Sequence, residues 1–357
     1  MDDIVINVLF EELQRRQNNK AWMRTLRDTS NPFNTPEEVF RKMFRFPRNL
    51  AHEYFLQMHQ FLEDGQRSTR IPAVTQFFIA LHFYAHGSYQ KSIGKDRDHS
   101  VCQSSVSRCL HRVTNTIVNH LAPRFIKFPQ TIDEITDVKN GFFDKFGFPG
   151  VVGAIDGTHI AIVCPPFGGI PPGNVYLNRK NFYSINAQII CDSALKILSL
   201  NCRYPGSVHD AAIWQMSAIF RHLRNNYRNG DRTSWLLGDA GYPLQPFLLL
   251  PIAGVNPETP QGRYSQAHIR ARNTVERCIG VVKGTFRCLL KDRTLHYKPA
   301  FAAKLIIACA TLHNNNMENE LEDHDDPDND HDNVDFADLY QEGINTRNLV
   351  IRNYFTD

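Results

Sequence analysis

The stretch Val151-Val-Gly-Ala-Ile-Asp-Gly-Thr-His159 sets the architecture of this chain. Its run of apolar and β-branched residues predicts a buried strand over residues 151–162. Asp156 interrupts the run beside Gly157, and the alternation of a strand places its side chain on the same face as Ala154. A carboxylate among buried residues is costly unless a cation pairs with it. Asp156 is therefore a candidate site residue.

Two further acids stand in comparable positions. Asp239 follows the apolar run Trp235-Leu-Leu-Gly and precedes the turn sequence Ala-Gly-Tyr-Pro. Glu276 lies in an arginine-rich segment of helical pattern, where Arg272, Glu276 and Lys283 fall on one face. An Asp before Gly is usually a turn residue, and a helical Glu near Arg is usually a surface pair. Two strand ends and a basic helix together, however, predict a site at the edge of an open sheet.

The combination of these acids indicates a chemistry. In-line cleavage of a phosphodiester uses one metal ion to generate hydroxide and a second to stabilise the leaving oxygen. Carboxylates about 4 Å apart repel by about 4 kcal/mol at an effective dielectric constant of about 20, so they converge only around cations. Hard oxygen ligands favour Mg²⁺ or Mn²⁺ over zinc. We therefore expect Asp156, Asp239 and Glu276 to be both catalytic and metal-binding.

The rest of the chain predicts helices around an α/β core. Residues 1–130 carry apolar residues at helical spacing, and residues 130–150 are rich in Gly and Pro and have the composition of a linker. A layered α/β core over residues 150–315 follows from strands that alternate with helices. The predicted strands are 151–162, 183–191, 195–203 and 235–237, and the predicted helices of the core are 210–225, 267–290 and 299–313.

Residues 77–121 have a pattern compatible with a helix-turn-helix. One helix ends at Gly87, a short helical segment covers residues 88–95, and a polar turn precedes a long amphipathic helix over residues 103–121. Arg108 and Arg112 lie on the polar faces of that helix and are candidate DNA-binding residues. An ordinary helical bundle with a solvated face fits the same pattern and is favoured by the pattern alone.

The charge of the chain is unevenly distributed. The net charge is +3, but residues 318–338 contain eleven acids and no Lys or Arg, which leaves about +14 on the remainder. A body this basic suits a polyanion such as DNA, although basic solvated surfaces are common. Arg179 and Lys180 are candidates to hold phosphates. The acidic segment cannot bury enough surface to fold, so we expect disorder there and a C-terminal tail over residues 339–357.

Several other classes of site fit poorly. The eight cysteines form no CxxC pair, which argues against a zinc cage. No apolar run is long enough to span a bilayer, and the N-terminus lacks the pattern of a signal peptide, so a reducing compartment is expected. Ser207, His209 and Asp210 are too close in sequence for a catalytic triad. We expect Asp210 to cap the following helix, and Ser207 or His209 to line the site.

The chain resembles the PIF/Harbinger superfamily of DDE transposases. The resemblance covers about residues 150–314 and extends upstream through two further blocks. The matching blocks are GAIDGTHI, YLNRKNFYSINAQIICD, YPGSVHDAAIW, WLLGDAGYP, ARNTVERCIGVVKGTFRCL and CATLHN, with FYAHGSYQ and QSSVSRCLHRVTNTIV upstream. The resemblance implies a ribonuclease-H-like DDE nuclease core whose acids correspond to Asp156, Asp239 and Glu276. It also implies a separate Myb-like DNA-binding partner.

These observations lead to one main expectation. The chain is expected to be a metal-dependent DNA endonuclease that works in the nucleus and is also present in the cytoplasm. A transposase-derived DNA-binding or adaptor protein without cleavage activity is the principal alternative, and a hydrolase of small phosphate esters is a third. Arg179, Lys180, Arg272 and Lys283 are expected to position phosphates near the acids.

Overall fold

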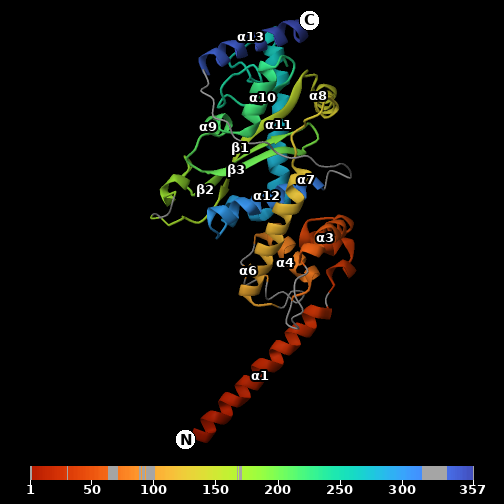
Figure 1. Cartoon of the computed structure of the whole chain (residues 1–357), viewed down its shortest axis with the longest axis vertical. Helices are drawn as coiled ribbons and strands as arrows, with labels where there is room; N and C mark the ends of the chain where they lie inside the picture. Colours follow the sequence, from red (N-terminus) through yellow and green to blue (C-terminus); the bar gives the residue numbers. More distant parts are fainter. Residues whose placement is uncertain are drawn as a thin grey trace. The chain divides into compact units, whose positions relative to one another are not determined.

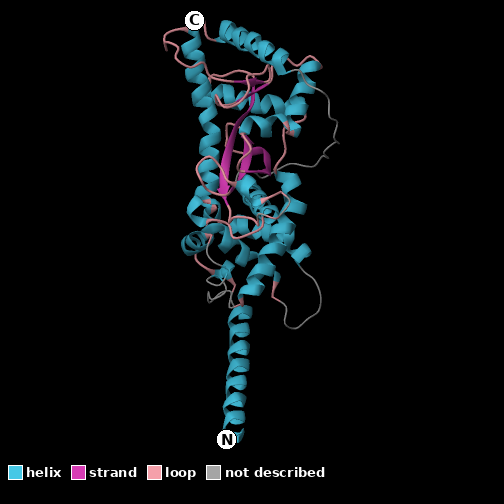
Figure 2. Cartoon of the chain, turned by 90° about the vertical axis from the view of Figure 1, so that its left-hand side faces the viewer, coloured by secondary structure: helices cyan, strands magenta, loops and turns pink. Residues whose placement is uncertain are grey.

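The chain forms two compact units. Figure 1 labels the helices and strands and colours them in sequence order. The computed structural model describes residues 2–29, 31–62, 71–87, 90, 93, 101–166, 168, 171–315 and 336–356. Unit 1 comprises Met1–His120 and Thr285–Leu289, and unit 2 comprises Leu121–Gly284 and Leu290–Asp357. All strands found among the described residues belong to unit 2. Figure 2 shows them in magenta. Among the described residues, no helix combines the length and the apolar composition that crossing a membrane requires.

Unit 1 is helical around α4. That helix is buried on nearly every side, with Phe77, Phe78 and Ile79 fully covered, and it contacts α2, α3, α6 and η4. It ends where the sequence predicts, at Gly87, whose left-handed backbone (φ 62°) suits a residue without Cβ. The elements of unit 1 are α1 (Asp2–Thr29), η1 (Pro32–Asn34), α2 (Glu37–Phe44), α3 (Arg48–Leu62), α4 (Ala73–His86), α6 (Gln103–Thr116) and η4 (Arg287–Leu289). A π-helical turn, η2 (Ile117–Leu121), follows α6.

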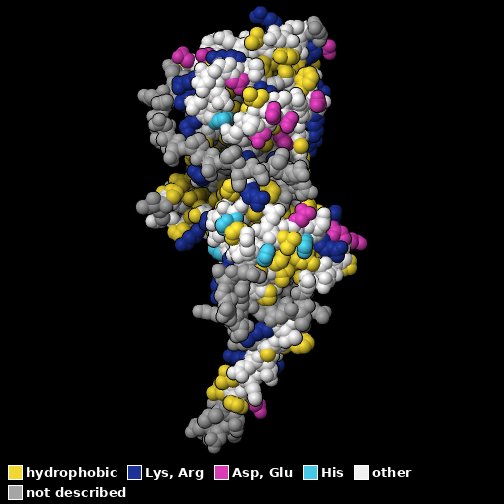
Figure 3. Space-filling view, turned by 45° about the vertical axis from the view of Figure 1, so that its right-hand side comes forward, with side chains coloured by type: hydrophobic (Ala, Val, Ile, Leu, Met, Phe, Trp, Pro, Cys, Tyr) yellow, Lys and Arg dark blue, Asp and Glu magenta, His cyan; other side chains and the backbone are white. Residues whose placement is uncertain are grey.

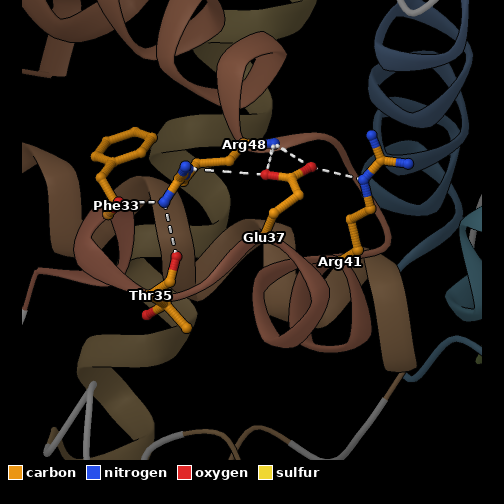
Figure 4. A network of polar contacts seen from close by, with 5 residues as sticks. All are labelled: Phe33, Thr35, Glu37, Arg41 and Arg48. Atoms are coloured by element: carbon orange, nitrogen blue, oxygen red, sulfur yellow. Dashed lines mark hydrogen bonds and ion pairs between the residues drawn. The ribbon is translucent and has the colours of Figure 1, made fainter.

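A polar network joins the start of α3 to the preceding elements (Figure 4). The guanidinium of Arg48 donates to the carbonyl oxygens of Thr35 (2.9 Å) and Phe33 (3.4 Å). The carboxylate of Glu37 pairs with the Nε atoms of Arg41 (2.6 Å) and Arg48 (3.7 Å). Three of these side chains are well exposed, at 60% for Arg41, 42% for Arg48 and 41% for Glu37. This network is a solvated link between helices in which two arginines share one acid.

The first helix, α1, has no buried core like the one around α4. Hydrophobic side chains lie on its surface, as Figure 3 shows. Val8, Leu9, Phe10, Leu13 and Trp22 are each more than half exposed. The helical spacing that the sequence predicts is confirmed, but α1 buries little apolar surface among the described residues.

The predicted long helix over residues 103–121 forms as α6 followed by η2. Arg108 is exposed and Arg112 is half-buried on α6. Most of the predicted short helix and turn over residues 88–100 lies outside the described residues. The helix-turn-helix therefore stays a prediction.

Unit 2 contains a five-stranded mixed sheet. Its strands are β1 (Val151–Ala161), β2 (Ser184–Cys191), β3 (Ile197–Pro205), β4 (Trp235–Leu237) and β5 (Leu248–Leu249), in the order β3-β2-β1-β4-β5. The β1–β2 and β2–β3 pairs are antiparallel, whereas β4 pairs in parallel with both β1 and β5. The four predicted strands are confirmed to within two residues at their ends. β5 was not predicted, because two residues are too short to show alternation.

Helices cover this sheet. α8 packs on β1, α12 on β3 and β2, α9 on β2 and α13 on β5. Asn314, at the end of α12, fixes one of these contacts: its side chain accepts from Ile197 N–H (2.7 Å) and donates to the Ile197 carbonyl (2.6 Å). The helical elements are α7 (Ala122–Phe125), α8 (Ile132–Phe146), η3 (Gly173–Tyr176), α9 (Asp210–Gln215), α10 (Ala218–Arg228), α11 (Pro260–Thr285), η5 (Lys291–Arg293), α12 (Pro299–Asn315) and α13 (Phe336–Tyr354).

The interpretation of residues 130–150 as a linker was wrong, because α8 occupies most of them. Thr131 and Glu134 form a capping box at its start, and left-handed Gly147 ends it. Phe142 is the only residue of α8 that is fully buried, so the apolar stripe is too thin to outweigh the flanking Gly and Pro in the sequence. The predicted helix 210–225 is likewise two helices, since Ser217 caps a new helix by accepting from Phe220 N–H (3.0 Å).

The predicted C-terminal tail is largely a folded helix, so this prediction was wrong in part. Residues 318–335 of the expected disordered segment lie outside the described residues, but residues 336–338 begin α13. Most of residues 339–357 are helical, and Leu339, Val350 and Ile351 are buried. Arg263 on α11 donates from Nη2 to the carbonyl of Phe355 at 2.8 Å. The C-terminal residues are thus part of the folded unit.

Candidate active site

The parallel pairing of β1 and β4 brings the first two acids to the same level. Ala154 is the register partner of Leu237. Asp156 lies two residues beyond Ala154 in the central strand, and Asp239 lies two residues beyond Leu237, just after β4 ends. The sheet thus brings together the two aspartates that the sequence predicts.

Arg272 on α11 is the point where all three predicted acids meet. Its Nη2 atom lies 2.9 Å from Asp156 Oδ2 and 3.8 Å from Asp239 Oδ2, and its Nη1 atom pairs with Glu276 Oε1. The side chain of Arg272 is only 11% exposed, and that of Asp156 18%, whereas Asp239 and Glu276 are about half exposed. Arg272 was predicted to hold phosphate, and here it contacts carboxylates. One positive charge therefore faces three negative ones.

Burial dominates the electrostatics of Asp156. It raises the pKa of that carboxyl to about 6, against the opposing effects of Arg272 and of the hydrogen bond from Gly157 N–H. The charges of Asp239 and Asp210 raise the pKa further. The guanidinium therefore compensates only part of the cost of an ionised Asp156.

Lys283 lies beside the same strand. Its ammonium donates to Thr158 Oγ1 (2.7 Å) and to the carbonyl of His159 (3.2 Å). Burial, helped by the charge of Lys180, lowers the pKa of Lys283 to about 8. Arg179 and Lys180 are exposed, and their charges reach His159, whose pKa is lowered mainly by burial. These predicted phosphate-binding residues therefore gather around the end of β1.

Asp210 is an acid that the sequence pattern assigned to a helix cap and not to the site. The expectation that it caps the helix was wrong, because His209 is the cap and Asp210 is the first residue of α9. Its Oδ1 atom accepts from Asn186 Nδ2 at 2.7 Å. Burial is the main cause of the raised pKa values of Asp156 and Tyr242, and the charge of Asp210 raises both further. Ser207 and His209 are exposed. Asp210 is a fourth carboxylate, close enough to Asp156 for its charge to raise the pKa of that group.

Two further polar residues, Asn186 and Gln188, donate hydrogen bonds to Asp210. Gln188 donates from Nε2 to the Asp210 carbonyl and to the Tyr242 hydroxyl, both at 3.2 Å. Asn186 and Gln188 are 2% and 3% exposed. The signal for them is in the sequence, because polar residues alternate along a strand that is otherwise built for burial. That signal could not name their partner.

No ready-made cluster of three metal-ligating side chains exists among the described residues. In the acidic site the guanidinium of Arg272 lies between the carboxylates. None of the eight cysteines, all of which lie among the described residues, forms a disulfide bond.

Comparisons with known proteins place the site within a family. Residues 155–314, which include all four acids, match the model of the DDE superfamily endonuclease. The human protein named "Putative nuclease HARBI1" is 33% identical over 291 residues, covering 80% of this chain and 79% of that protein, and the Rattus norvegicus protein of the same name gives the same figures.

A more distant relative and the solved structures complete the comparison. "Protein ALP1-like" of Arabidopsis thaliana is 27% identical over 228 residues, covering 59% of this chain and 53% of that protein. No solved structure matches. The predicted fold class is confirmed: N-terminal helices precede a mixed α/β sheet consistent with a ribonuclease-H-like core. The chain belongs to the DDE superfamily endonucleases, alongside the Harbinger-derived HARBI1 proteins.

Proposed function

We propose that this chain is a divalent-metal-dependent endonuclease that cleaves DNA. The observation that carries the proposal is the convergence of Asp156, Asp239 and Glu276, from three separate elements, on the single cation of Arg272. The family supports the reaction class. The basic side chains around the end of β1 support a polyanionic substrate.

The residues at this site fit a divalent cation. All the candidate ligands are hard carboxylate oxygens, the donors that Mg²⁺ and Mn²⁺ prefer. The negative charges outnumber the single positive charge of the guanidinium among them, and burial disfavours the ionised form of Asp156. Asp156, Asp239 and Glu276 would hold the ions. Bound divalent ions would supply the activation of water and the stabilisation of the leaving oxygen.

The protein's own side chains would prepare the site. Arg272 keeps the acids together before metal binding and, once released from Asp156, can contact phosphate through its planar fork of donors. Lys283 places a positive charge beside Thr158, and exposed Arg179 and Lys180 would hold the DNA backbone. A separate Myb-like protein would supply target recognition. We place this activity in the nucleus, with a cytoplasmic fraction, which fractionation of cells would check.

Nicking of supercoiled plasmid tests the proposal. Purified full chain is incubated with Mg²⁺, with Mn²⁺ or with EDTA, alone and with a Myb-like partner. The variants are Asp156→Asn and Asp239→Asn, and the matched control is Asp137→Asn, an exposed position on α8. We expect metal-dependent nicking that falls at least about 1000-fold in both site variants and is unchanged in the control, because the lost charge-stabilisation is worth several kcal/mol.

The results separate the proposal from its alternative. Equal nicking by wild type and Asp156→Asn would refute the site assignment. Salt-sensitive DNA binding without nicking, under every metal and with the partner present, would refute the nuclease and favour a DNA-binding adaptor.

A further inference from the structure

Asp210 presses against the backbone of the residue that follows Asp156. A Cβ atom built on Gly157 would lie 2.1 Å from Asp210 Oδ1 and 2.6 Å from its Cγ. Real Cβ atoms never approach so closely, so the carboxylate occupies space that only glycine leaves open at this position. The absence of a side chain at residue 157 is therefore what admits a fourth acid to the strand that carries Asp156.

Buried amides hold Asp210 in this place. Asn186, which is 2% exposed, donates from Nδ2 to Asp210 Oδ1 (2.7 Å) and to the Val208 carbonyl (3.0 Å). Gln188 donates to the Asp210 backbone carbonyl (3.2 Å). The Oδ1 atom of Asn186 is buried and has no hydrogen-bond partner within the described part of the chain. An unpartnered buried carbonyl is costly, and it lies on the amide that is directed at the carboxylate.

A purely structural role explains this arrangement poorly. An acid in the first turn of a helix gains from the helix dipole, but α9 is only six residues long and Asp210 is not its cap. The charge of Asp210 also acts unfavourably on ionised Asp156, in a site where acids already outnumber Arg272. Packing one more carboxylate there reduces the stability of the chain without a cation.

We propose that Asp210 is a fourth metal-binding carboxylate of the site, seated against Gly157 and oriented by Asn186, which is a positioning residue. This inference rests on the proposed function, since it concerns the same divalent ions. It assigns to Asp210 a ligand role beyond that of the three acids identified from the sequence. Gly157 gives the carboxylate room to lie next to Asp156.

Binding of Mn²⁺ to the full chain tests the role directly, without any cleavage assay. The affinity is measured by isothermal titration and by the electron paramagnetic resonance signal of free Mn²⁺, for wild type, Asp210→Asn and the control Asp137→Asn. Asparagine keeps an oxygen that can accept from Asn186, while it removes the charge and replaces the second carboxylate oxygen with an amide nitrogen. We expect Mn²⁺ affinity at least about tenfold weaker in Asp210→Asn and unchanged in Asp137→Asn.

Melting temperatures in EDTA distinguish a ligand from a structural carboxylate. A ligand predicts that Asp210→Asn melts no lower than wild type, because a repulsion is relieved, and that its stabilisation by Mn²⁺ is smaller. A structural carboxylate predicts a lower melting temperature in EDTA and an unchanged Mn²⁺ affinity, and this pair of results would overturn the inference.

Gly157→Ala provides an independent variant. The added methyl group must displace Asp210 while leaving its charge in the chain. We expect weaker Mn²⁺ binding in Gly157→Ala, and we expect the double variant Gly157→Ala/Asp210→Asn to bind no more weakly than Asp210→Asn alone. Strictly additive losses would show that Gly157→Ala does not act through Asp210 and would contradict the inference.

Failure of this inference differs from failure of the proposed function. If wild type binds Mn²⁺ through Asp156 and Asp210→Asn binds equally well, only the fourth ligand is refuted. If wild type binds no Mn²⁺, or if Asp156→Asn binds it as well as wild type does, the metal site itself is refuted and both proposals fall.

Discussion

Two arginine-containing networks in this chain differ in composition and in exposure. In unit 1 one acid, Glu37, pairs with two arginines, and the side chains are 41% to 60% exposed (Figure 4). In unit 2 one arginine, Arg272, contacts three acids and is 11% exposed. The first network is solvated and has an excess of base. The second has an excess of acid around Arg272, and its Arg272–Asp156 pair is largely buried while Asp239 and Glu276 are about half exposed.

The difference indicates what each network is for. Exposed ion pairs are screened by solvent and contribute little to stability, so the unit 1 network mainly orients α3. Partly buried carboxylates that outnumber their cationic partner oppose folding unless a further cation compensates them. The excess around Arg272 is therefore better explained by ligand binding than by stability.

We expect the largest change in stability from removal of Arg272. In Arg272→Ala the buried Asp156 loses its closest positive charge, so we expect the free energy of unfolding in EDTA at pH 7.5 to fall by about 3–5 kcal/mol. Fluorescence during urea unfolding can follow unit 2, since Trp214 and Trp235 are buried there. Millimolar Mg²⁺ should stabilise the variant more than wild type.

The matched control for this experiment is Arg270→Ala, an exposed arginine on the same helix. It should leave the unfolding midpoint almost unchanged. An Arg272→Ala protein as stable as the control would mean that the acids do not depend on this guanidinium.

The second prediction concerns pH and Asp156. Its pKa in the folded protein, about 6, exceeds the ordinary value of 3.8, so ionised Asp156 destabilises the fold. The destabilisation is complete above pH 6 and disappears as the pH falls from about 6 to about 4. At pH 7.5 in EDTA, Asp156→Asn should therefore unfold with a free energy about 3 kcal/mol higher than that of wild type.

Urea unfolding at pH 7.5 and at pH 4 checks this sign. The advantage of Asp156→Asn should be present at the higher pH and nearly absent at the lower. An Asp156→Asn protein that is less stable than wild type at pH 7.5 would show that the ion pair with Arg272 outweighs burial.

The smallest effect should come from the network of unit 1. Glu37→Gln removes the acid between Arg41 and Arg48, but the α3 contacts from Arg48 to the carbonyls of Phe33 and Thr35 remain. We expect a barely measurable fall in melting temperature and unchanged Mn²⁺ affinity. A loss as large as that of Arg272→Ala would remove the distinction between the two networks.

Much of the site could be predicted from local sequence. Asp156 and Asp239 interrupt or follow apolar runs, and such runs identify strands by themselves. Glu276 and Arg272 are four residues apart on a helix, so their pairing follows from helical geometry alone, and the structure confirms it. The local pattern also predicted four of the five strands.

The parts that the sequence did not reveal depend on contacts between distant residues. The link from Asn186 to Asp210 joins β2 to α9, and Gln188 reaches Tyr242 beyond β4, so neither has a local signature. The sequence around Asp210 fits a helix cap as well as it fits a site residue. Helix α8 was missed because its buried stripe is thin, and α13 because acidic residues precede it.

The order of these residues along the chain has a consequence for biosynthesis. The polypeptide emerges with Asp156 and Asp239 first, and the residue that pairs with both, Arg272, comes more than thirty residues after the second of them. A nascent chain that stops before α11 therefore carries the negative charges of the sheet without their partner. The central strands should consequently consolidate late in synthesis, when α11 has left the ribosome and its arginine can reach β1.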